Sequence, residues 1–167
     1  HDGGIELESE PGKGTAFNIY LPCVTTQEIE DTKEVREKFS GTERILLVDD
    51  ERMVLQSIGP YLEHFGYKVE ALTSPKAALA VFQSMPDQFD ILVTDQMMPG
   101  MTGDLLAQKI REIRPNIPVI LCTGYAPPAS ANRRNIVELN EIVSKPVEPS
   151  ELGYVIRKTL DGGAERR

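Results

Sequence analysis

The sequence is poor in basic residues, with 18 Lys and Arg against 26 Asp and Glu in 167 positions and a formal net charge of -8. A nucleic-acid surface needs basic residues gathered on one face. The short Arg133-Arg134 pair does not supply one, so we expect no nucleic-acid partner. Long apolar runs are also missing, and the first residues lack the basic-then-apolar pattern of a signal peptide. We therefore expect a cytoplasmic chain without direct membrane contact.

Cysteine and histidine are scarce, with two of each. Cys23 and Cys122 lie far apart and lack the spacing of a metal site, so they are expected to be reduced thiols of an intracellular protein. His64 lies near the end of a predicted helix, where a cation is favoured, and is expected to be a surface residue.

The chain is long enough for one domain with its own core and a partial second one. From Glu43 onward, short apolar runs alternate with amphipathic stretches, a pattern typical of βαβ units and a parallel sheet. The periodicity predicts strands near 44–48, 67–71, 90–94, 118–122 and 141–144.

Polar side chains stand where these predicted strands end. Asp49 and Asp50 follow the first strand, Asp95 the third, Thr123 the fourth and Lys145 the fifth. In an open parallel sheet, groups at the carboxyl ends of the strands can converge on one site. Acids, a hydroxyl and an ammonium together suit a divalent cation such as Mg²⁺ and a phosphoryl group. A carboxylate is also a competent nucleophile for phosphoryl transfer.

Further motifs stand beside these residues, namely Met98-Pro99 and Gly103 after Asp95, Gly124 after Thr123, and Pro146 after Lys145. With them, residues 43 to 160 resemble the response-regulator receiver domain, the phosphoacceptor half of two-component signalling. The resemblance implies an α/β, flavodoxin-like doubly wound (βα)5 fold with a five-stranded parallel sheet in the order 2-1-3-4-5. It also implies a partner that donates a phosphoryl group from phosphohistidine.

The resemblance assigns a role to each acid. Asp95 would be the phosphoacceptor and also a metal ligand. Asp50 would bind Mg²⁺ directly and Asp49 through water, and the backbone carbonyl of Met97 would be a further ligand. Three carboxylates in one pocket repel one another, so a bound cation or Lys145 is expected to be needed for all three to ionise.

The resemblance also implies a switch. Thr123 and Lys145 would complete the catalytic set by binding phosphoryl oxygens, and Thr123 would draw its loop inward. Receivers commonly carry an aromatic residue three positions before the lysine, where this chain has Ile142, which puts the aromatic version of the switch in doubt. Met97 and Tyr125 are the candidate modulators of acyl-phosphate lifetime. The Lys145-Pro146 bond is expected to be cis.

The first residues predict a separate β-hairpin, because apolar residues alternate on both sides of a turn at Pro11–Gly14. This stretch resembles the end of the ATP-binding catalytic domain of sensor histidine kinases, through His1, Gly3-Gly4, Gly12-Lys13-Gly14-Thr15 and a terminal Leu21-Pro22. A lone hairpin is marginal in water. We expect it to pack on the receiver or on a sheet edge of another chain, a second copy in a homodimer included.

The resulting domain boundaries are a catalytic-domain remnant at 1–22, a charged linker at 23–42, a receiver at 43–162 and a tail at 163–167. The ATP-binding boxes and the phosphorylated histidine of such a kinase would lie upstream. We therefore expect the parent to be a hybrid histidine kinase, whose anchor to a membrane is left open, and this chain to act as its phosphoacceptor rather than as a kinase.

Two alternatives remain open from the sequence. One is a receiver-like interaction module that is never phosphorylated, against which the intact acids, Thr123 and Lys145 weigh. The other is an aspartate-nucleophile phosphohydrolase of the haloacid-dehalogenase type. Those enzymes place a second Asp two residues after the nucleophile, where this chain has Met97.

Overall fold

The structure is a computed structural model that describes residues 3–20, 39–124 and 140–164. It divides into two compact units, His1–Thr32 and Lys33–Arg167, and each is described by itself. In the described residues no helix is long and apolar enough to cross a membrane.

The first unit contains the predicted hairpin. Strands β1 (Gly4–Glu10) and β2 (Gly14–Tyr20) pair in antiparallel register around a turn in which Gly12 and Gly14 have φ of 80° and 103°. These left-handed conformations favour glycine, so the two glycines explain why the chain reverses here. The hairpin prediction is confirmed.

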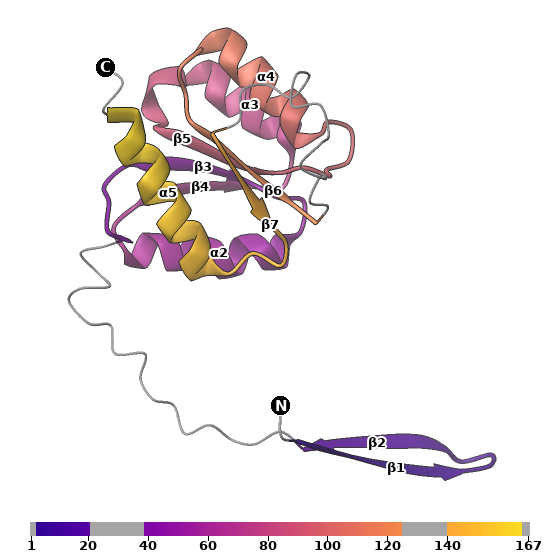
Figure 1. Ribbon diagram of the computed structural model, residues 1–167. Coiled ribbons are helices and arrows are strands. Elements are labelled where there is room, and N and C mark those ends of the chain that lie inside the picture. The colour runs from indigo at the N-terminus through magenta and orange to yellow at the C-terminus, as the bar shows by residue number, and fades with distance from the viewer. Residues whose placement is uncertain (1–2, 21–38, 125–139, 165–167) are drawn as a thin grey trace, which may run out of the picture. The chain divides into compact units, whose positions relative to one another are not determined.

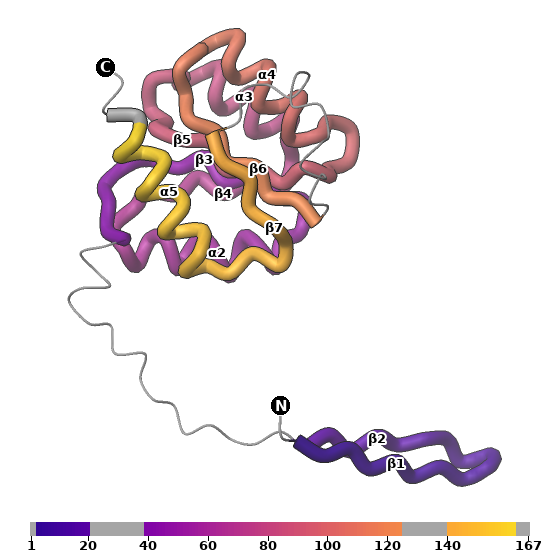
Figure 2. Tube along the Cα trace, viewed as in Figure 1, coloured from indigo at the N-terminus to yellow at the C-terminus, as the bar shows by residue number. Residues whose placement is uncertain are grey.

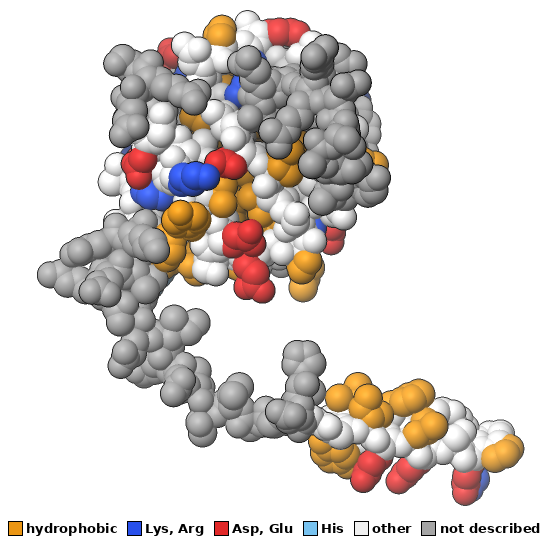
Figure 3. Space-filling view, viewed as in Figure 1, with side chains coloured by type: hydrophobic (Ala, Val, Ile, Leu, Met, Phe, Trp, Pro, Cys, Tyr) orange, Lys and Arg blue, Asp and Glu red, His pale blue; other side chains and the backbone are white. Residues whose placement is uncertain are grey.

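The two faces of the hairpin differ sharply in character. Ile5 lies opposite Ile19 and Leu7 opposite Phe17, so one face is apolar, whereas the acidic side chains of β1 line the other side (Figure 3). These four apolar side chains are all more than half exposed on the hairpin. What covers that face stays a prediction.

The second unit is built on one five-stranded parallel sheet (Figure 1). Its strands lie in the order β4-β3-β5-β6-β7, which is the predicted order 2-1-3-4-5. Each strand begins within one residue of its predicted position: β3 (Arg44–Val48), β4 (Lys68–Leu72), β5 (Ile91–Asp95), β6 (Val119–Thr123) and β7 (Glu141–Ser144).

Helices cover both faces of this sheet (Figure 2). Helices α2 (Arg52–His64) and α5 (Pro149–Ala164) pack together on one face, and α3 (Pro75–Ser84) and α4 (Gly103–Ile113) on the other. A short 3₁₀ helix, η1 (Pro86–Gln88), precedes β5. The segment between β6 and β7 that contains Tyr125 lies outside the described residues.

The core explains why the strands read as continuous apolar runs. Ile45 and Leu47 of β3 face the α2–α5 layer, and Leu46 and Val48 face the α3–α4 layer. A strand buried on both faces needs apolar residues at every position. Since each fully buried aliphatic side chain contributes about 1.5–3 kcal/mol, these two layers hold the strand ends in place.

Candidate functional site

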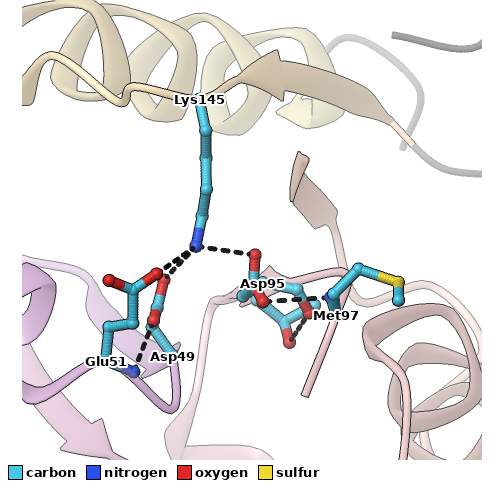
Figure 4. A network of polar contacts seen from close by, with 6 residues as sticks. Asp49, Glu51, Asp95, Met97 and Lys145 are labelled. Carbon is cyan, nitrogen blue, oxygen red and sulfur yellow. Dashed lines mark hydrogen bonds and ion pairs between the residues drawn. The ribbon is translucent and has the colours of Figure 1, made fainter. Parts of the chain in front are cut away.

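Three acidic side chains gather around one ammonium group at the carboxyl edge of the sheet (Figure 4). Lys145 Nζ lies 2.8 Å from Asp95 Oδ1, 3.0 Å from Asp49 Oδ2 and 3.6 Å from Glu51 Oε1. Asp95 ends β5, Asp49 follows β3 and Lys145 follows β7. Residues far apart in the sequence therefore meet because parallel strands end at one edge.

The two buried carboxylates are held in the same way. Asp95 is 5% exposed and its Oδ2 accepts a hydrogen bond from the Met97 N–H at 3.0 Å. Asp49 is 3% exposed and its Oδ1 accepts from the Glu51 N–H at 2.8 Å. Each carboxylate thus gives one oxygen to the backbone two residues further on and the other to Lys145, which fixes its orientation.

The β7 end of the site is fastened to β6. The Lys145 N–H donates to the Thr123 carbonyl at 2.8 Å, so these two predicted site residues are neighbours. Thr123 is itself buried at the end of β6. The Lys145-Pro146 bond is cis, as expected.

Gly103 keeps the loop after Asp95 close to the sheet. A methyl group at Gly103 would overlap the Asp95 carbonyl oxygen and would lie 2.9 Å from Leu121 Cδ1. The Gly103 N–H also donates to the Gln96 carbonyl at 3.0 Å. Only a residue without a Cβ therefore lets α4 begin directly against the backbone of Asp95.

The donor set suits a hard divalent cation. The carboxylates of Asp49 and Asp95 converge on Lys145. Among the described residues, no group of three or more His, Cys, Asp or Glu side chains has the geometry of a metal site. Mg²⁺ needs only one or two carboxylates and fills its remaining positions with water and phosphate oxygens. Two converging carboxylates, beside the exposed Asp50, fit that requirement.

This arrangement matches a known family. The family model for the response regulator receiver domain matches residues 45–157, which is more than half of the chain. The chain belongs to the response regulator receiver domain family.

Solved structures share the fold of this receiver. The chain superposes on a CheY-like response regulator receiver domain protein from Methanospirillum hungatei JF-1 with a TM-score of 0.68 and 30% identity, covering 76% of this chain and all of that one. The receiver domain of the hybrid histidine kinase CckA gives a TM-score of 0.59 at 27% identity, covering 70% of this chain and 98% of that one.

Curated relatives include sensor kinases. The chain is 31% identical over 168 residues to the sensor kinase CckA of Brucella abortus (strain 2308), covering 95% of this chain and 18% of that protein. It is 26% identical over 170 residues to the aerobic respiration control sensor protein ArcB of Escherichia coli (strain K12), covering 95% of this chain and 21% of ArcB. The receiver chain thus spans about a fifth of the length of these relatives.

Burial sets the electrostatics of the receiver site. Burial raises the pKa of the Asp49 carboxyl, and the Glu51 N–H and the Lys145 ammonium offset only part of the rise. Burial lowers the pKa of Lys145, but hydrogen bonds to Asp95 and Asp49 raise it more, so the ammonium stays charged. The raised pKa of Asp49 favours its neutral form, whereas the raised pKa of Lys145 favours its charged form, so the two shifts disagree about this ion pair. The 3.0 Å contact argues for an ionised Asp49, whose remaining desolvation cost a bound cation would relieve.

The remaining predicted residues lie around this centre. Asp50 is exposed, whereas its neighbour Asp49 is buried and pairs with Lys145. The Met97 side chain is 73% exposed, and that of Ile142 on β7 is 43% exposed. Tyr125 falls outside the described residues.

Glu51 is a residue of the site that the sequence did not predict. Glu51 is the N-cap residue of α2, but its side chain makes no capping hydrogen bond and lies near Lys145 instead. Its place next to the acid pair was the one available signal. The backbone turns after Asp49 so that the Glu51 N–H donates to the Asp49 carboxylate, and this turn brings the Glu51 side chain close to the site.

Cys122, the residue before Thr123, is expected to resist alkylation in the folded receiver. It is 5% exposed, and burial raises the pKa of its thiol to about 12. At pH 8 the reactive thiolate is then about one part in ten thousand, since each pKa unit is a factor of ten. Iodoacetamide labelling followed by peptide mass spectrometry should modify Cys122 only after addition of denaturant. Equal labelling rates in native and denaturing buffer would contradict this.

Proposed function

We propose that this chain is a phosphoacceptor that takes a phosphoryl group from a phosphohistidine onto Asp95. The observation that carries the proposal is the Asp95 carboxylate, buried at the end of β5 with one oxygen on the Met97 N–H and the other on the Lys145 ammonium. A carboxylate held in this way is oriented for attack, and a cation stands ready beside it.

In the proposed step, a carboxylate oxygen of Asp95 attacks phosphorus and forms a P–O bond. The P–N bond to the donor imidazole breaks, and its electron pair returns to the ring nitrogen, which takes up a proton. The Lys145 ammonium, 2.8 Å from Asp95, neutralises charge on the phosphoryl oxygens. The hydroxyl of Thr123 is assigned to hydrogen-bond one of those oxygens.

Asp50 and Asp95, with the Met97 carbonyl, are the residues assigned to hold Mg²⁺, with Asp49 acting through water. When bound, this ion supplies charge neutralisation for the phosphoryl oxygens. Asp49 and Asp95 would then share their charge between the ion and Lys145, which supports the ionised state of all three carboxylates.

We further propose that the chain is part of a hybrid histidine kinase. The matches to CckA and ArcB cover 95% of the chain and so reach into the β1–β2 hairpin, which supports its assignment to the end of a kinase catalytic domain. In this proposal residues 1–22 are that remnant, 23–42 the linker, 43–162 the receiver and 163–167 the tail. The donor is a phosphohistidine on the kinase itself or on a relay protein, and a second copy is one candidate partner for the hairpin. We place the chain in the cytoplasm, where ATP feeds such donors.

Intact-mass spectrometry tests the proposal. The purified chain is incubated with acetyl phosphate and Mg²⁺, and one phosphoryl adduct is expected. A chelator present from the start should prevent formation of the adduct, because the carboxylates then lack their second cation. No adduct from acetyl phosphate or from a phosphorylated histidine protein would favour an interaction module that is never phosphorylated.

The acyl phosphate on Asp95 is expected to last longer than minutes. Met97 extends from the loop beside the site with 73% of its surface exposed and has no group that could orient an attacking water. Replacing Met97 with Asn, which offers an amide to that water, should shorten the half-life. The decay of the adduct mass after removal of the donor measures this. A wild-type half-life of minutes or less would contradict it.

A further inference from the structure

The residues just before β3 are fixed to the helices of the receiver. We call Phe39–Glu43 the anchor segment. The Phe39 ring packs edge-on against Phe65, with centroids 6.0 Å apart, and against Tyr154 of α5, with centroids 6.4 Å apart. Phe39 is partly buried and packs against the apolar cluster on the α2–α5 side of the sheet. One aromatic side chain of the anchor segment thus touches both the end of α2 and the middle of α5.

A close backbone contact holds the anchor segment at its centre. The Gly41 N–H donates to the Phe65 carbonyl at 3.0 Å. A methyl group at Gly66, where φ is 96°, would lie 2.6 Å from the Gly41 carbonyl oxygen, and one at Gly41 would overlap the Tyr67 ring. Two glycines are therefore required for the segment to lie this close to the α2–β4 turn.

An ion-pair network holds the end of the segment. Glu43 Oε1 lies 2.8 Å from Arg157 Nη1, and Glu43 Oε2 accepts from the Thr42 N–H at 2.8 Å. Arg157 also pairs with Asp161 one turn further along α5, at 2.8 Å. Both Glu43 and Arg157 are largely covered, with side chains 26% and 20% exposed. Partial burial makes this pair stronger than an ordinary surface ion pair.

Helices α2 and α5 connect the anchor segment to the phosphorylation site. Helix α2 begins at the acid cluster, directly after Glu51, and ends beside Phe65. Helix α5 begins shortly after Lys145 and carries Tyr154 and Arg157. Both helices pack on one core through side chains that are at most 7% exposed: Leu55, Ile58, Leu62, Leu152 and Ile156. A close-packed core passes on a shift of one helix as a rigid movement.

We propose that the anchor segment reports the phosphorylation state of Asp95, through α5, to the part of the chain that precedes the receiver. The inference rests on the proposed function. In the unphosphorylated receiver the Lys145 ammonium is shared between Asp49 and Asp95. A phosphoryl group on Asp95 gives the Lys145 ammonium new oxygen partners. Movement of Lys145 toward them pulls on the start of α5, which follows it in the chain. A shift of α5 relative to α2 separates the two rings that hold Phe39 and so loosens the anchor segment.

A single fluorophore can test this, because the chain contains no tryptophan. In Phe39→Trp, the indole replaces the ring between Phe65 and Tyr154. Because Phe39 is partly buried, we expect acrylamide to quench this indole less than it quenches free indole before any donor is added. Quenching should rise when acetyl phosphate and Mg²⁺ produce the adduct. It should not rise in the double variant that carries both Phe39→Trp and Asp95→Asn. The adduct mass is recorded in the same samples.

The outcomes separate the two proposals. An adduct without a change in quenching overturns the anchor inference alone. The absence of an adduct both with acetyl phosphate and with a phosphorylated histidine protein overturns the proposed function and the inference with it. If the indole of Phe39→Trp is quenched like free indole before any donor is added, the anchor itself is overturned, provided that circular dichroism shows an intact fold.

A second pair of variants reaches the same question from the other side. Coupling between two sites is reciprocal, so breaking the anchor should favour phosphorylation. Arg157→Gln removes the contact with Glu43. In reversible transfer with a phosphorylated histidine protein, we expect the equilibrium ratio of phosphorylated to unphosphorylated chain to rise about fivefold, the lower end for coupled sites. Lys158→Gln is the matched control, because Lys158 lies next on α5 and pairs with Glu141 of β7 at 2.8 Å instead. Equal ratios in the two variants would overturn the proposal.

Discussion

Replacing Asp95 with Asn is expected to abolish the phosphoryl adduct completely. The amide has the shape of the carboxylate, and its oxygen can still accept the Met97 N–H bond that holds the side chain at the end of β5. It has no negative charge, however, and is not a nucleophile toward phosphorus. The change also removes one of the three carboxylates that surround the Lys145 ammonium. Intact-mass spectrometry with acetyl phosphate and Mg²⁺ measures the loss.

The matched control is Asp87→Asn. It makes the same chemical change at an exposed acid in η1, before β5 begins, whereas Asp95 ends that strand. We expect adduct formation at the wild-type level in this variant. An undiminished adduct in Asp95→Asn would mean that another residue is the acceptor, and mapping the modified peptide would show which.

Replacing Gly103 with Ala is expected to destabilise the receiver by about 3 kcal/mol, the upper range for an overpacked buried site. The new methyl group would overlap the Asp95 carbonyl oxygen, and Leu121 Cδ1, at 2.9 Å, leaves it no other direction. The start of α4 must then move away from β5. Urea unfolding should show a lower midpoint with an unchanged m value.

Gly153→Ala serves as the control for that measurement. Gly153 is also a buried helical glycine, in α5, but a methyl group there would meet only Tyr61 Cε1 at an ordinary 3.6 Å. Ala is the better helix former by about 1 kcal/mol, so this variant should be as stable as the wild type or more stable. Equal destabilisation of the two variants would show that the close contact at Gly103 does not limit the fold.

The contrast between the two glycines illustrates what a sequence can state. Gly103 was recognised as part of a family motif, and its position eight residues after Asp95 was visible in the sequence. Its physical role, to let a helix start against the backbone of Asp95, depends on the distance between two elements. That distance is set by the packing of α4 on the sheet.

The sequence by itself determined the sheet and the identity of the residues at its carboxyl edge. The strands are buried on both faces, so their apolar runs stand out from the amphipathic helices that separate them. Parallel strands end at one edge, so Asp49, Asp95, Thr123 and Lys145 could be placed together before any geometry was known.

Only the tertiary structure decided which of these groups touch. Asp49 is buried against Lys145 and Asp50 is exposed, because successive side chains of an extended chain point to opposite sides. The anchoring of Phe39 on Phe65 and Tyr154 was equally hidden, since residues 23–42 read as a charged linker. Local pattern determines secondary structure and strand ends, whereas contacts between residues distant in sequence depend on how helices pack across the finished sheet.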